Sequence, residues 1–479
     1  MIGGGPAGVT AALRARELGA SVALVERGNM GGTCTNDGCV PTRALAKAAR
    51  LVRDAEQFGN FGLVGEKPEV DFPRLLERTQ RVVYLIHEKK QLTSHLQRAG
   101  VELFANAGDA RFLDDHTVAF GDSSLRAEKF IICAGGHARR LAFPGSDLCL
   151  THSDVWSLEK LPRSVAIVGG AATGCQLASI FAAFGSRVSL LDLAPRLLPG
   201  EDEEVSQGIM AAFQRRGIQA LTGAGGVERV ERQGADLRLV YSMGGQTASL
   251  AVETVILAVG WPGNVDSLGL EAAGVKSERG YIQVDDSLRT NVPYIFAAGD
   301  ITGRMMLVQS ASGEGAVAAE NAVLGTERAY VHRLVPHGGF TDPEYASVGL
   351  TESQARAQHD CAVAMVPYTN LDRAVIDGHE EGFCKLIVAK DTRAIIGAHV
   401  VCEEAVEVVQ IAAAGMAAGV RVEQLAQLEL AYPTFTAIVG LAARQAVRLL
   451  DAAPPEASWQ ALGREQGTPG AAEWEWSET

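Results

Sequence analysis

The stretch GGGPAG, residues 3–8, decides the fold of this chain. An alanine-rich stretch follows over residues 9–18, and a short apolar stretch, residues 21–25, leads to Glu26. In a strand–helix–strand unit, glycines at the first, third and sixth places permit a tight turn and let a pyrophosphate approach the helix N-terminus. An acid at the end of the second strand receives ribose hydroxyls. The stretch, called the first fingerprint below, therefore predicts a dinucleotide-binding unit at the start of the chain.

A second copy of this pattern begins with an apolar stretch at residues 164–168 and continues as GGAATG, residues 169–174. Alanine takes the middle glycine place of this second fingerprint and still allows a fairly close approach of the backbone. Residues 187–191 are expected to form the next strand, which leads to Asp192. An acid there favours a free ribose 2′-hydroxyl, so NADH is predicted over NADPH. Arg196 lies nearby and opposes this prediction, because an arginine can bind the 2′-phosphate of NADPH.

Cys34 and Cys39 lie in the redox segment GGTCTNDGCVP, residues 31–41, just after the first fingerprint. Two thiols at this spacing can close a disulfide if the segment opens a helix. Beside a bound redox cofactor, such a pair would act as a two-electron relay. On spacing alone, two buried structural cysteines or half of a metal site are alternatives. Metal sites usually space their cysteines more closely and repeat the pair, so no metal site is expected.

Three further stretches are expected to be apolar strands that end beside a nucleotide. Residues 290–300, TNVPYIFAAGD, bring Asp300 to the end of a strand, where a carboxylate can meet ligand hydroxyls. The expected strand within residues 130–136 ends at Ala134 and is followed by Gly135. The expected strand within residues 255–260 ends at Gly260.

Together with FTDPEYASVGLT at residues 340–351, these motifs identify a resemblance. The chain resembles the flavoprotein disulfide reductases of the pyridine nucleotide type: dihydrolipoamide dehydrogenase, glutathione and mycothione reductases, and mercuric reductase. The resemblance implies an α/β fold with two Rossmann-like three-layer nucleotide-binding domains and an α+β dimerisation domain. The expected parts are an FAD-binding domain with the redox disulfide (1–145), an NAD-binding domain (146–265), a central FAD-binding segment (266–330), the dimerisation domain (331–450) and a C-terminal extension (451–479).

The resemblance also implies a homodimer and assigns residues to each cofactor. Cys39 would lie against the flavin, and Cys34, as the outer thiol, would attack the substrate. The residues expected to bind FAD are Gly3, Gly5, Pro6, Ala7, Gly8, Glu26, Gly32, Thr33, Ala134, Gly135 and Asp300. The residues expected to bind the nicotinamide nucleotide are Gly169, Ala171, Gly174, Asp192 and Gly260.

The chain departs from the family where a histidine of the partner subunit shuttles the proton of the attacking thiol. The corresponding stretch is LAYPTFTA, residues 430–437, with Tyr432 in the histidine position and Ala437 in that of its orienting glutamate. A phenol with an ordinary pKa near 10 is a poor base at neutral pH. Mercuric reductases also lack the histidine, but they place a tyrosine one residue after the proline, where this chain has Thr434, and they end in a cysteine pair that is missing here.

A second departure concerns an ion pair that the family places beside the flavin. The lysine position after the redox segment is Arg43, and the glutamate position in the second fingerprint's helix is Gln176. Neutral drift is one explanation. The functional explanation is that an uncompensated guanidinium stabilises anionic reduced flavin. Arg43, Gln176 and Tyr432 are therefore predicted site residues alongside the two cysteines.

Composition restricts the class of protein. The chain has 479 residues, 47% hydrophobic residues and a formal net charge of −14, which argues against nucleic acid or an anionic membrane as partner. Eight cysteines in so long a chain are no secreted disulfide framework. With no signal-peptide pattern and no apolar run of spanning length, a cytoplasmic location is expected.

These observations predict an NADH-dependent, FAD-containing oxidoreductase that reduces a small-molecule or protein disulfide or a thiol-reactive electrophile. A metal-ion reductase of the mercuric type is the first alternative. A flavoprotein that reduces quinones or other small electrophiles, or that acts in regulation, is the second. Retention of both Cys34 and Cys39 argues against a purely regulatory protein.

Overall fold

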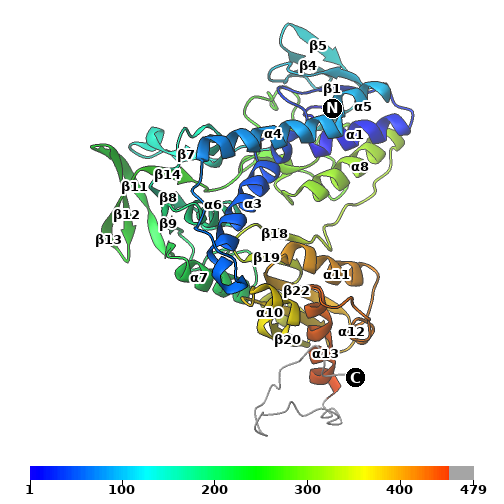
Figure 1. Ribbon diagram of the computed structural model, residues 1–479. Coiled ribbons are helices and arrows are strands. Elements are labelled where there is room, and N and C mark those ends of the chain that lie inside the picture. The colour runs from blue at the N-terminus through cyan, green and yellow to red at the C-terminus, as the bar shows by residue number, and fades with distance from the viewer. Residues whose placement is uncertain (452–479) are drawn as a thin grey trace. The chain divides into compact units, whose positions relative to one another are not determined.

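The computed structural model of the protein describes residues 1–451 (Figure 1). Contacts divide the chain into two compact units. Unit 1 comprises Met1–Ala142, Ser146–Leu161 and Ile256–His332, and unit 2 comprises Phe143–Gly145, Pro162–Val255 and the chain from Arg333 on. The predicted C-terminal extension lies outside the described residues, apart from residue 451.

A parallel sheet forms the middle layer of unit 1. The strand β1 (Ala23–Val25) pairs with β2 (Glu102–Phe104), and β6 (Phe130–Ile132) pairs with β17 (Ile295–Ala297). Ile2 forms parallel bridges to both Val25 and Ile132. The first strand of the predicted strand–helix–strand unit is thus a single bridging residue that joins the two strand pairs.

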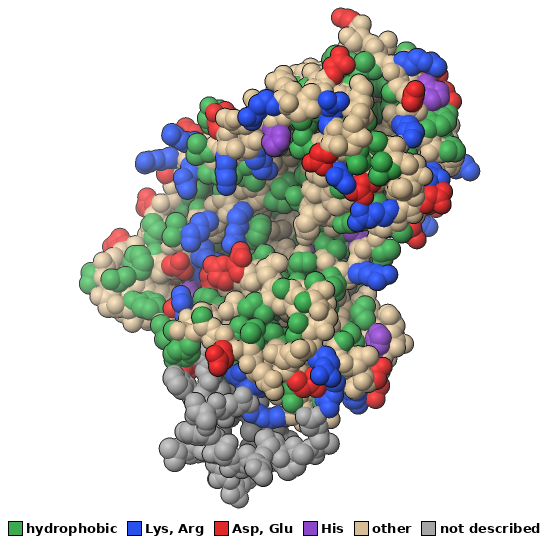
Figure 2. Space-filling model, turned by 90° about the vertical axis from the view of Figure 1, so that its right-hand side faces the viewer, with side chains coloured by type: hydrophobic (Ala, Val, Ile, Leu, Met, Phe, Trp, Pro, Cys, Tyr) green, Lys and Arg blue, Asp and Glu red, His purple; other side chains and the backbone are tan. Residues whose placement is uncertain are grey.

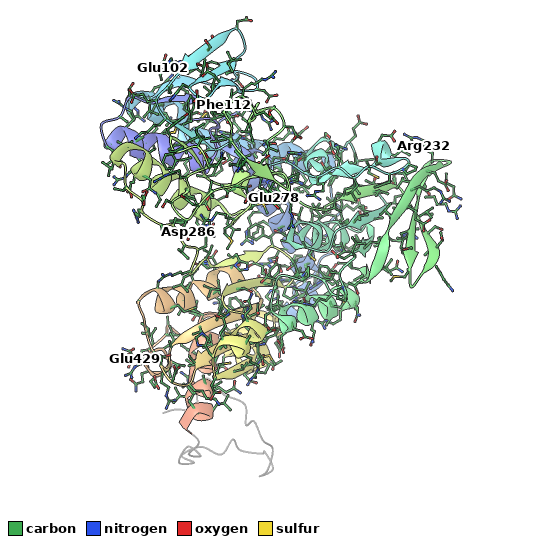
Figure 3. The ribbon with its side chains drawn as sticks, turned by 180° about the vertical axis from the view of Figure 1, so that it is seen from behind. Glu102, Phe112, Arg232, Glu278, Asp286 and Glu429 are labelled. Carbon is green, nitrogen blue, oxygen red and sulfur yellow. The ribbon has the colours of Figure 1, made fainter. Side chains whose placement is uncertain are left out.

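Helices cover one face of this layer and a second sheet covers the other. The helix α1 (Pro6–Glu17) packs against α8 (Val308–Leu324), and a Cβ added at Gly315 would lie 2.3 Å from the carbonyl oxygen of Ala7. The small residues of both helices therefore allow their backbones to touch. On the other face lies the antiparallel sheet of β3 (Arg111–Asp114), β4 (Thr117–Phe120) and β5 (Ser123–Arg126), from which Phe112 (Figure 3) is buried against the parallel layer.

Unit 1 contains further helices and short strands. They are α2 (Gly32–Asn36), α3 (Cys39–Glu56), η1 (Phe58–Phe61), α4 (Phe72–Lys90), α5 (Leu92–Arg98), η2 (Ser146–Leu148), β7 (Leu150–Thr151), η3 (His152–Ser157), β15 (Ser277–Glu278), β16 (Tyr281–Ile282) and η4 (Asp300–Thr302). The strand β14 (Thr254–Leu257) pairs in parallel with β7 through Ile256 and Leu257.

Unit 2 begins with the strand–helix–strand unit that the second fingerprint predicts. The strand β8 (Ser164–Val168) leads through α6 (Ala172–Ala183) to β9 (Arg187–Leu191), and the two strands pair in parallel. The helix α7 (Glu203–Arg215) follows, and β10 (Gln219–Leu221) pairs with β9. An antiparallel sheet completes this part with β11 (Ala224–Gln233), β12 (Asp236–Met243) and β13 (Gln246–Val252).

The rest of unit 2 is an antiparallel sheet with helices packed against both faces. The strand order is β18 (His337–Gly339), β19 (Glu344–Gly349), β22 (Ile395–Cys402), β21 (Phe383–Ala389) and β20 (Cys361–Pro367). The accompanying helices are α9 (Glu352–Gln358), η5 (Tyr368–Asn370), α10 (Asp372–Asp377), α11 (Ala405–Ala417), α12 (Val422–Ala426) and α13 (Ala437–Asp451). Side chains of α11 and α13 share one apolar core with the sheet, and each fully buried large side chain contributes roughly 1.5–3 kcal/mol.

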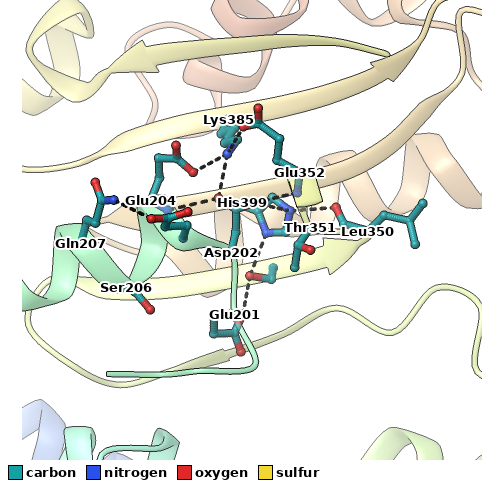
Figure 4. A network of polar contacts seen from close by, with 12 residues as sticks. Glu201, Asp202, Glu204, Ser206, Gln207, Leu350, Thr351, Glu352, Lys385 and His399 are labelled. Carbon is teal, nitrogen blue, oxygen red and sulfur yellow. Dashed lines mark hydrogen bonds and ion pairs between the residues drawn. The ribbon is translucent and has the colours of Figure 1, made fainter. Parts of the chain in front are cut away.

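A charged network, called the Lys385 network, ties elements of unit 2 together (Figure 4). Lys385 on β21 is 1% exposed and forms ion pairs with Asp202 at 2.8 Å, with Glu352 at 2.6 Å and with Glu204. His399 on β22 hydrogen-bonds the carbonyl oxygen of Leu350 at 2.9 Å. The start of α7, the start of α9 and two strands are thereby joined.

The architecture confirms the predicted fold class, a mixed α/β chain with two nucleotide-binding parts and a dimerisation part. Within residues 1–451, no helix combines the length and the apolar character needed to cross a membrane. On the face drawn in Figure 2, basic side chains alternate with acidic ones.

Candidate active site

The first fingerprint forms a turn in which side chains have no room. Gly3 has a φ of +106°, and a Cβ there would lie 2.2 Å from the carbonyl oxygen of Cys133. A Cβ at Gly8 would lie 1.9 Å from the carbonyl oxygen of Gly3. The turn then enters α1 at Pro6, whose fixed φ suits a first helical position. The N-terminus of a twelve-residue helix is thereby left open to a phosphate.

Glu26 is held in place by the backbone around this turn. Its Oε2 accepts a hydrogen bond from the amide of Gly4 at 2.6 Å, and its Oε1 accepts one from Gly28 at 2.8 Å. A carboxylate oxygen can accept more than one hydrogen bond, so this anchored group can still receive the ribose hydroxyls of a nucleotide.

The start of the redox segment lies directly against the first fingerprint. The amide of Gly31 donates to the carbonyl oxygen of Gly4 at 2.9 Å. A Cβ added at Gly32 would lie 2.8 Å from the Cα of Gly5. These two glycine backbones close one side of the cradle, and Thr33 follows in the same helix, α2.

Asp300 lies at the other side of the unit 1 site. Its Oδ2 accepts a hydrogen bond from the indole Nε1 of Trp261 at 2.9 Å, and burial raises the pKa of its carboxyl. The preceding turn is fixed by Glu314, fully buried, which accepts a hydrogen bond from the amide of Gly299 at 2.6 Å and pairs with His332 at 2.7 Å. Asp300 is therefore held where its remaining lone pairs can meet a ligand.

Ala134 and Gly135 follow β6 and are held by a side chain that the sequence did not single out. The amide nitrogen of Asn264 donates from its side chain to the carbonyl oxygen of Ala134 at 2.7 Å, and its backbone amide donates to Gly135 at 3.0 Å. Asn264 follows Gly260 by four residues, in the loop after β14.

Cys34 and Cys39 lie on two different helices. Cys34 is in α2, and Cys39 is the first residue of α3, with Asp37 and Gly38 between the helices. The segment thus opens two helices where the spacing predicts one. Both cysteines are present as thiols. A hydrogen bond from Cys34 lowers the pKa of Cys39 to about 7 against the effect of burial, and the same contact and burial raise the pKa of Cys34.

The turn between these helices is clamped by η3. The carboxylate of Asp37 accepts hydrogen bonds from the hydroxyl of Ser153 at 2.6 Å and from the indole of Trp156 at 2.7 Å. His152 lies 3.7 Å from the same carboxylate and packs its ring against Trp261. Burial lowers the pKa of His152. This chain of contacts links the redox segment to Asp300 through one unit.

The last turn of α4 holds the redox segment from another direction. His87 Nε2 contacts the side-chain oxygen of Asn36 at 2.7 Å, and Lys90 Nζ donates to the hydroxyl of Thr35 at 3.1 Å. The sequence gave no signal for Lys90, because the contact joins residues 55 positions apart.

The second fingerprint repeats the first in unit 2. Gly169 has a φ of +110°, and a Cβ at Gly174 would lie 1.8 Å from its carbonyl oxygen. Asp192 accepts hydrogen bonds from the amide of Gly170 and, at 2.6 Å, from that of Ala194, as Glu26 does from its two amides. Ala171 has φ −82° and ψ −172°, close to the −75° and −174° of Gly5. Alanine is therefore unstrained at this place.

Arg196 and Gln176 have partners within unit 2. The guanidinium of Arg196 donates to the carbonyl oxygens of Pro199 and Glu201, each at 2.9 Å. The side-chain oxygen of Gln176 accepts a hydrogen bond from the amide of Phe340 at 3.1 Å. Arg43 lies in α3 of unit 1, so Arg43 and Gln176 belong to different units.

Tyr432 is 52% exposed and has an acidic partner that the sequence did not indicate. Its hydroxyl donates to the carboxylate of Asp372, the first residue of α10, at 2.9 Å. Sixty positions separate the two residues in the chain. Ala437, the position of the family's orienting acid, is instead buried at the start of α13.

The six remaining cysteines lie in the interior of the protein. Cys133, Cys149, Cys175, Cys361, Cys384 and Cys402 are all buried. Burial raises the pKa of Cys133 to about 12 and that of Cys149 to about 11, so neither is a ready nucleophile. In the described part of the chain, no three His, Cys, Asp or Glu side chains group as metal ligands.

Known proteins are similar to this chain over most of its length. Residues 1–315 match the family described as pyridine nucleotide-disulphide oxidoreductase, and residues 335–443 match the dimerisation domain of that family. A dihydrolipoyl dehydrogenase from Geobacillus stearothermophilus is 34% identical, covering 93% of this chain and 95% of its own. A mercuric reductase from Staphylococcus aureus is 31% identical, and the match covers 92% of this chain and 81% of the reductase.

Solved structures agree with the sequence matches. The HOCl-induced flavoprotein disulfide reductase RclA from Escherichia coli has a TM-score of 0.82 and 28% identity, covering 92% of this chain and 98% of its own. The Cu(II) complex of RclA has a TM-score of 0.81 and 28% identity, and the match covers 91% of this chain and 97% of the RclA chain. The resemblance predicted from the motifs is thus confirmed, and the family binds FAD and a pyridine nucleotide. The chain belongs to the pyridine nucleotide-disulphide oxidoreductase family.

Proposed function

We propose that the chain is an NADH-dependent, FAD-containing oxidoreductase that reduces a disulfide or a thiol-reactive acceptor at Cys34 and Cys39. One observation carries this proposal: the two thiols contact each other at the start of α3, in the same unit as the first fingerprint. The charge of Asp300, the carboxylate expected to bind FAD, acts on Cys39. This supports the assignment of Cys39 as the thiol nearer the cofactor.

The residues of unit 1 fit FAD and those of unit 2 fit NADH. The glycine cradle of the first fingerprint, with Glu26 and Asp300 at its two ends, would hold FAD together with Gly32, Thr33, Ala134 and Gly135. When bound, the two cofactors supply the two electrons that convert the Cys34–Cys39 disulfide into thiols. Asp192 supports NADH, and Arg196 is engaged by carbonyl oxygens rather than poised for a 2′-phosphate.

The thiols then complete the reaction with a disulfide acceptor in two exchanges. The Cys34 thiolate attacks one acceptor sulfur, the acceptor S–S bond breaks, and the first product thiolate leaves and takes up a proton. The Cys39 thiolate attacks the Cys34 sulfur of the mixed disulfide and releases the second product. Cys34 and Cys39 are oxidised to a disulfide, and the acceptor gains two electrons and two protons.

The proposed assembly is a homodimer in which Tyr432 serves the redox pair of the partner subunit. The match to the family's dimerisation domain and the exposure of Tyr432 support this assignment. Asp372 would orient the phenol, which can donate a hydrogen bond to a thiolate but does not remove its proton readily at neutral pH.

A screen of acceptors with matched variants tests the proposal. The wild-type protein, Cys34→Ser and, as control, Cys149→Ser would be assayed for NADH oxidation with small disulfides, quinones and metal ions. Loss of activity in Cys34→Ser alone, for a disulfide or an electrophile, is the expected result. Equal activity of Cys34→Ser and wild type with every acceptor would contradict the proposal.

A metal-ion reductase is the second candidate. It is favoured by the similarity to mercuric reductases, by a structural relative solved as a Cu(II) complex, and by the absence of histidine at position 432. A metal ion bound by two thiolates needs no proton shuttle for its capture. Hg(II) or Cu(II) as the best acceptor in the same screen would favour this candidate over disulfide reduction.

A further inference from the structure

The end of α4 carries a cation, Lys90, that contacts the helix of Cys34 within the same chain. The helix begins after Asp71, whose side chain caps the amide of Arg74, and ends at Lys90. Phe72, Leu76 and Thr79 are buried along it and fix its direction. Its last turn therefore has a defined position beside α2.

Two contacts join this turn to the residues that follow Cys34. Lys90 Nζ donates to Thr35 Oγ1 at 3.1 Å, and Thr35 is 1% exposed, so the hydroxyl that receives Lys90 cannot move away. His87, one turn earlier on the same face, contacts Asn36 at 2.7 Å. The ammonium group is thus held next to the helix that carries Cys34.

The charges around the thiols make this cation important. Lys90 lowers the pKa of both Cys34 and Cys39, whereas Asp300 raises that of Cys39 and burial raises both. Asp37 adds a carboxylate in the turn between the helices. The carbonyl end of α4 also carries partial negative charge, which disfavours a nearby thiolate. Lys90 is a cation that offsets these groups.

We propose that Lys90 is a positioning residue of the redox pair, whose ammonium group stabilises the Cys34 thiolate and so lets the chain react with its acceptor although position 432 is not histidine. This inference rests on the proposed function in one respect, that Cys34 is the thiol that meets the acceptor. It adds a residue that acts from the same chain, independently of any group from a partner subunit.

The test is the pH dependence of Cys34 alkylation in the reduced holoenzyme. Protein reduced with dithiothreitol and freed of reductant would react with iodoacetamide between pH 5 and 10, and mass spectrometry would follow modification at Cys34. In Lys90→Gln we expect the midpoint to rise by about one pH unit, the lower end of the effect of a nearby opposite charge. The rate at neutral pH then falls about tenfold.

Two control variants separate charge from structure. Lys90→Arg keeps the charge and is expected to stay within a few tenths of a unit of the wild-type midpoint. Lys89→Gln removes an equal charge from the neighbouring exposed position. No contact described for residues 1–451 joins Lys89 to Thr35, so the alkylation midpoint of this variant should match that of wild type. Flavin absorbance of each variant reports that the fold is retained.

The outcomes for the proposed role of Lys90 and for the proposed function can be told apart. An unchanged midpoint in Lys90→Gln, or an equal rise in Lys89→Gln, would overturn the proposal for Lys90. Failure of the proposed function would appear elsewhere, as full NADH-dependent activity of Cys34→Ser, and would leave the alkylation profiles interpretable.

Discussion

Tyr432 stands where the resemblance to the family predicts a histidine, and the structure changes what a substitution there should do. Sequence reasoning indicated that histidine alone at position 432 would lack an orienting acid, because Ala437 takes that acid's place. Asp372, however, already accepts a hydrogen bond from the Tyr432 hydroxyl at 2.9 Å. A carboxylate is therefore within reach of this position.

We predict that Tyr432→His alone increases the specificity constant for glutathione disulfide or lipoamide, by on the order of 10²-fold if the base reaches the thiol. The wild-type chain should reduce these small disulfides poorly. Adding Asp372→Asn to the histidine variant should remove most of the gain, because the ring loses its orienting acid. Steady-state kinetics with each disulfide measure both effects. Fast reduction by the wild type would show that no histidine is needed.

Asp192 is the residue that should set nucleotide preference. NADH should be preferred over NADPH by at least about tenfold in kcat/KM, roughly 1.4 kcal/mol, because the carboxylate repels a 2′-phosphate. Asp192→Ser should reduce this ratio, whereas Arg196→Gln should leave it unchanged, since Arg196 is engaged by carbonyl oxygens. A ratio that falls in Arg196→Gln would instead assign the preference to that guanidinium.

At the scale of elements, η3 holds the break between α2 and α3. Trp156 and Ser153 both donate to the carboxylate of Asp37, and these bonds fix the turn that separates the two cysteines. We predict that Trp156→Phe lowers the free energy of unfolding by about 1.5–3 kcal/mol, the usual value of a hydrogen bond to a charged group.

Denaturant unfolding of the oxidised holoenzyme measures this loss. Ser157→Ala is the matched control, because its hydroxyl donates to a carbonyl oxygen on the exposed side of the same element and should cost little. A loss in Trp156→Phe no larger than that in Ser157→Ala would show that the clamp does not stabilise the turn.

The Lys385 network joins four elements of unit 2 and makes stability depend on pH (Figure 4). Burial opposes ionisation of Asp202, but hydrogen bonds with Glu204, Glu352 and Lys385 hold its pKa well below the ordinary value. A carboxyl group with a depressed folded pKa contributes stability that is fully present above its unfolded pKa, about 4, and is lost progressively as pH falls from there through the folded pKa.

We predict that Lys385→Met destabilises unit 2 by about 3–5 kcal/mol, because it leaves the buried carboxylate of Asp202 without its cation. Lys390→Met is the control, since Lys390 is half exposed, pairs with Asp360 at 2.9 Å, and should cost at most about 1 kcal/mol. Unfolding midpoints at pH 7 and at pH 4 measure both variants. The difference between Lys385→Met and wild type should shrink at pH 4, and a constant difference would contradict the assignment to charge.

Across the whole molecule, the features that could be predicted from the sequence are those set by residues close together in the chain. Each fingerprint, its helix and its acid lie within about thirty residues, so spacing alone predicted an acid at the end of the second strand of each unit. The structure adds that Glu26 and Asp192 each accept a hydrogen bond from the backbone of the glycine turn. The interruption at Asp37 and Gly38 was not predicted, because it depends on Ser153 and Trp156, more than one hundred positions away. Lys90 and Asp372 escaped prediction for the same reason.

The central claim is that Cys34 and Cys39 form the working redox pair, with Cys39 nearer the flavin. Anaerobic reduction of the holoenzyme by NADH, followed by absorption spectroscopy, tests it most directly. The account predicts a long-wavelength thiolate–flavin charge-transfer band in reduced wild type, no such band in Cys39→Ser, and a band in Cys34→Ser even before reduction. Spectra of wild type and both variants that coincide before and after NADH would contradict the account.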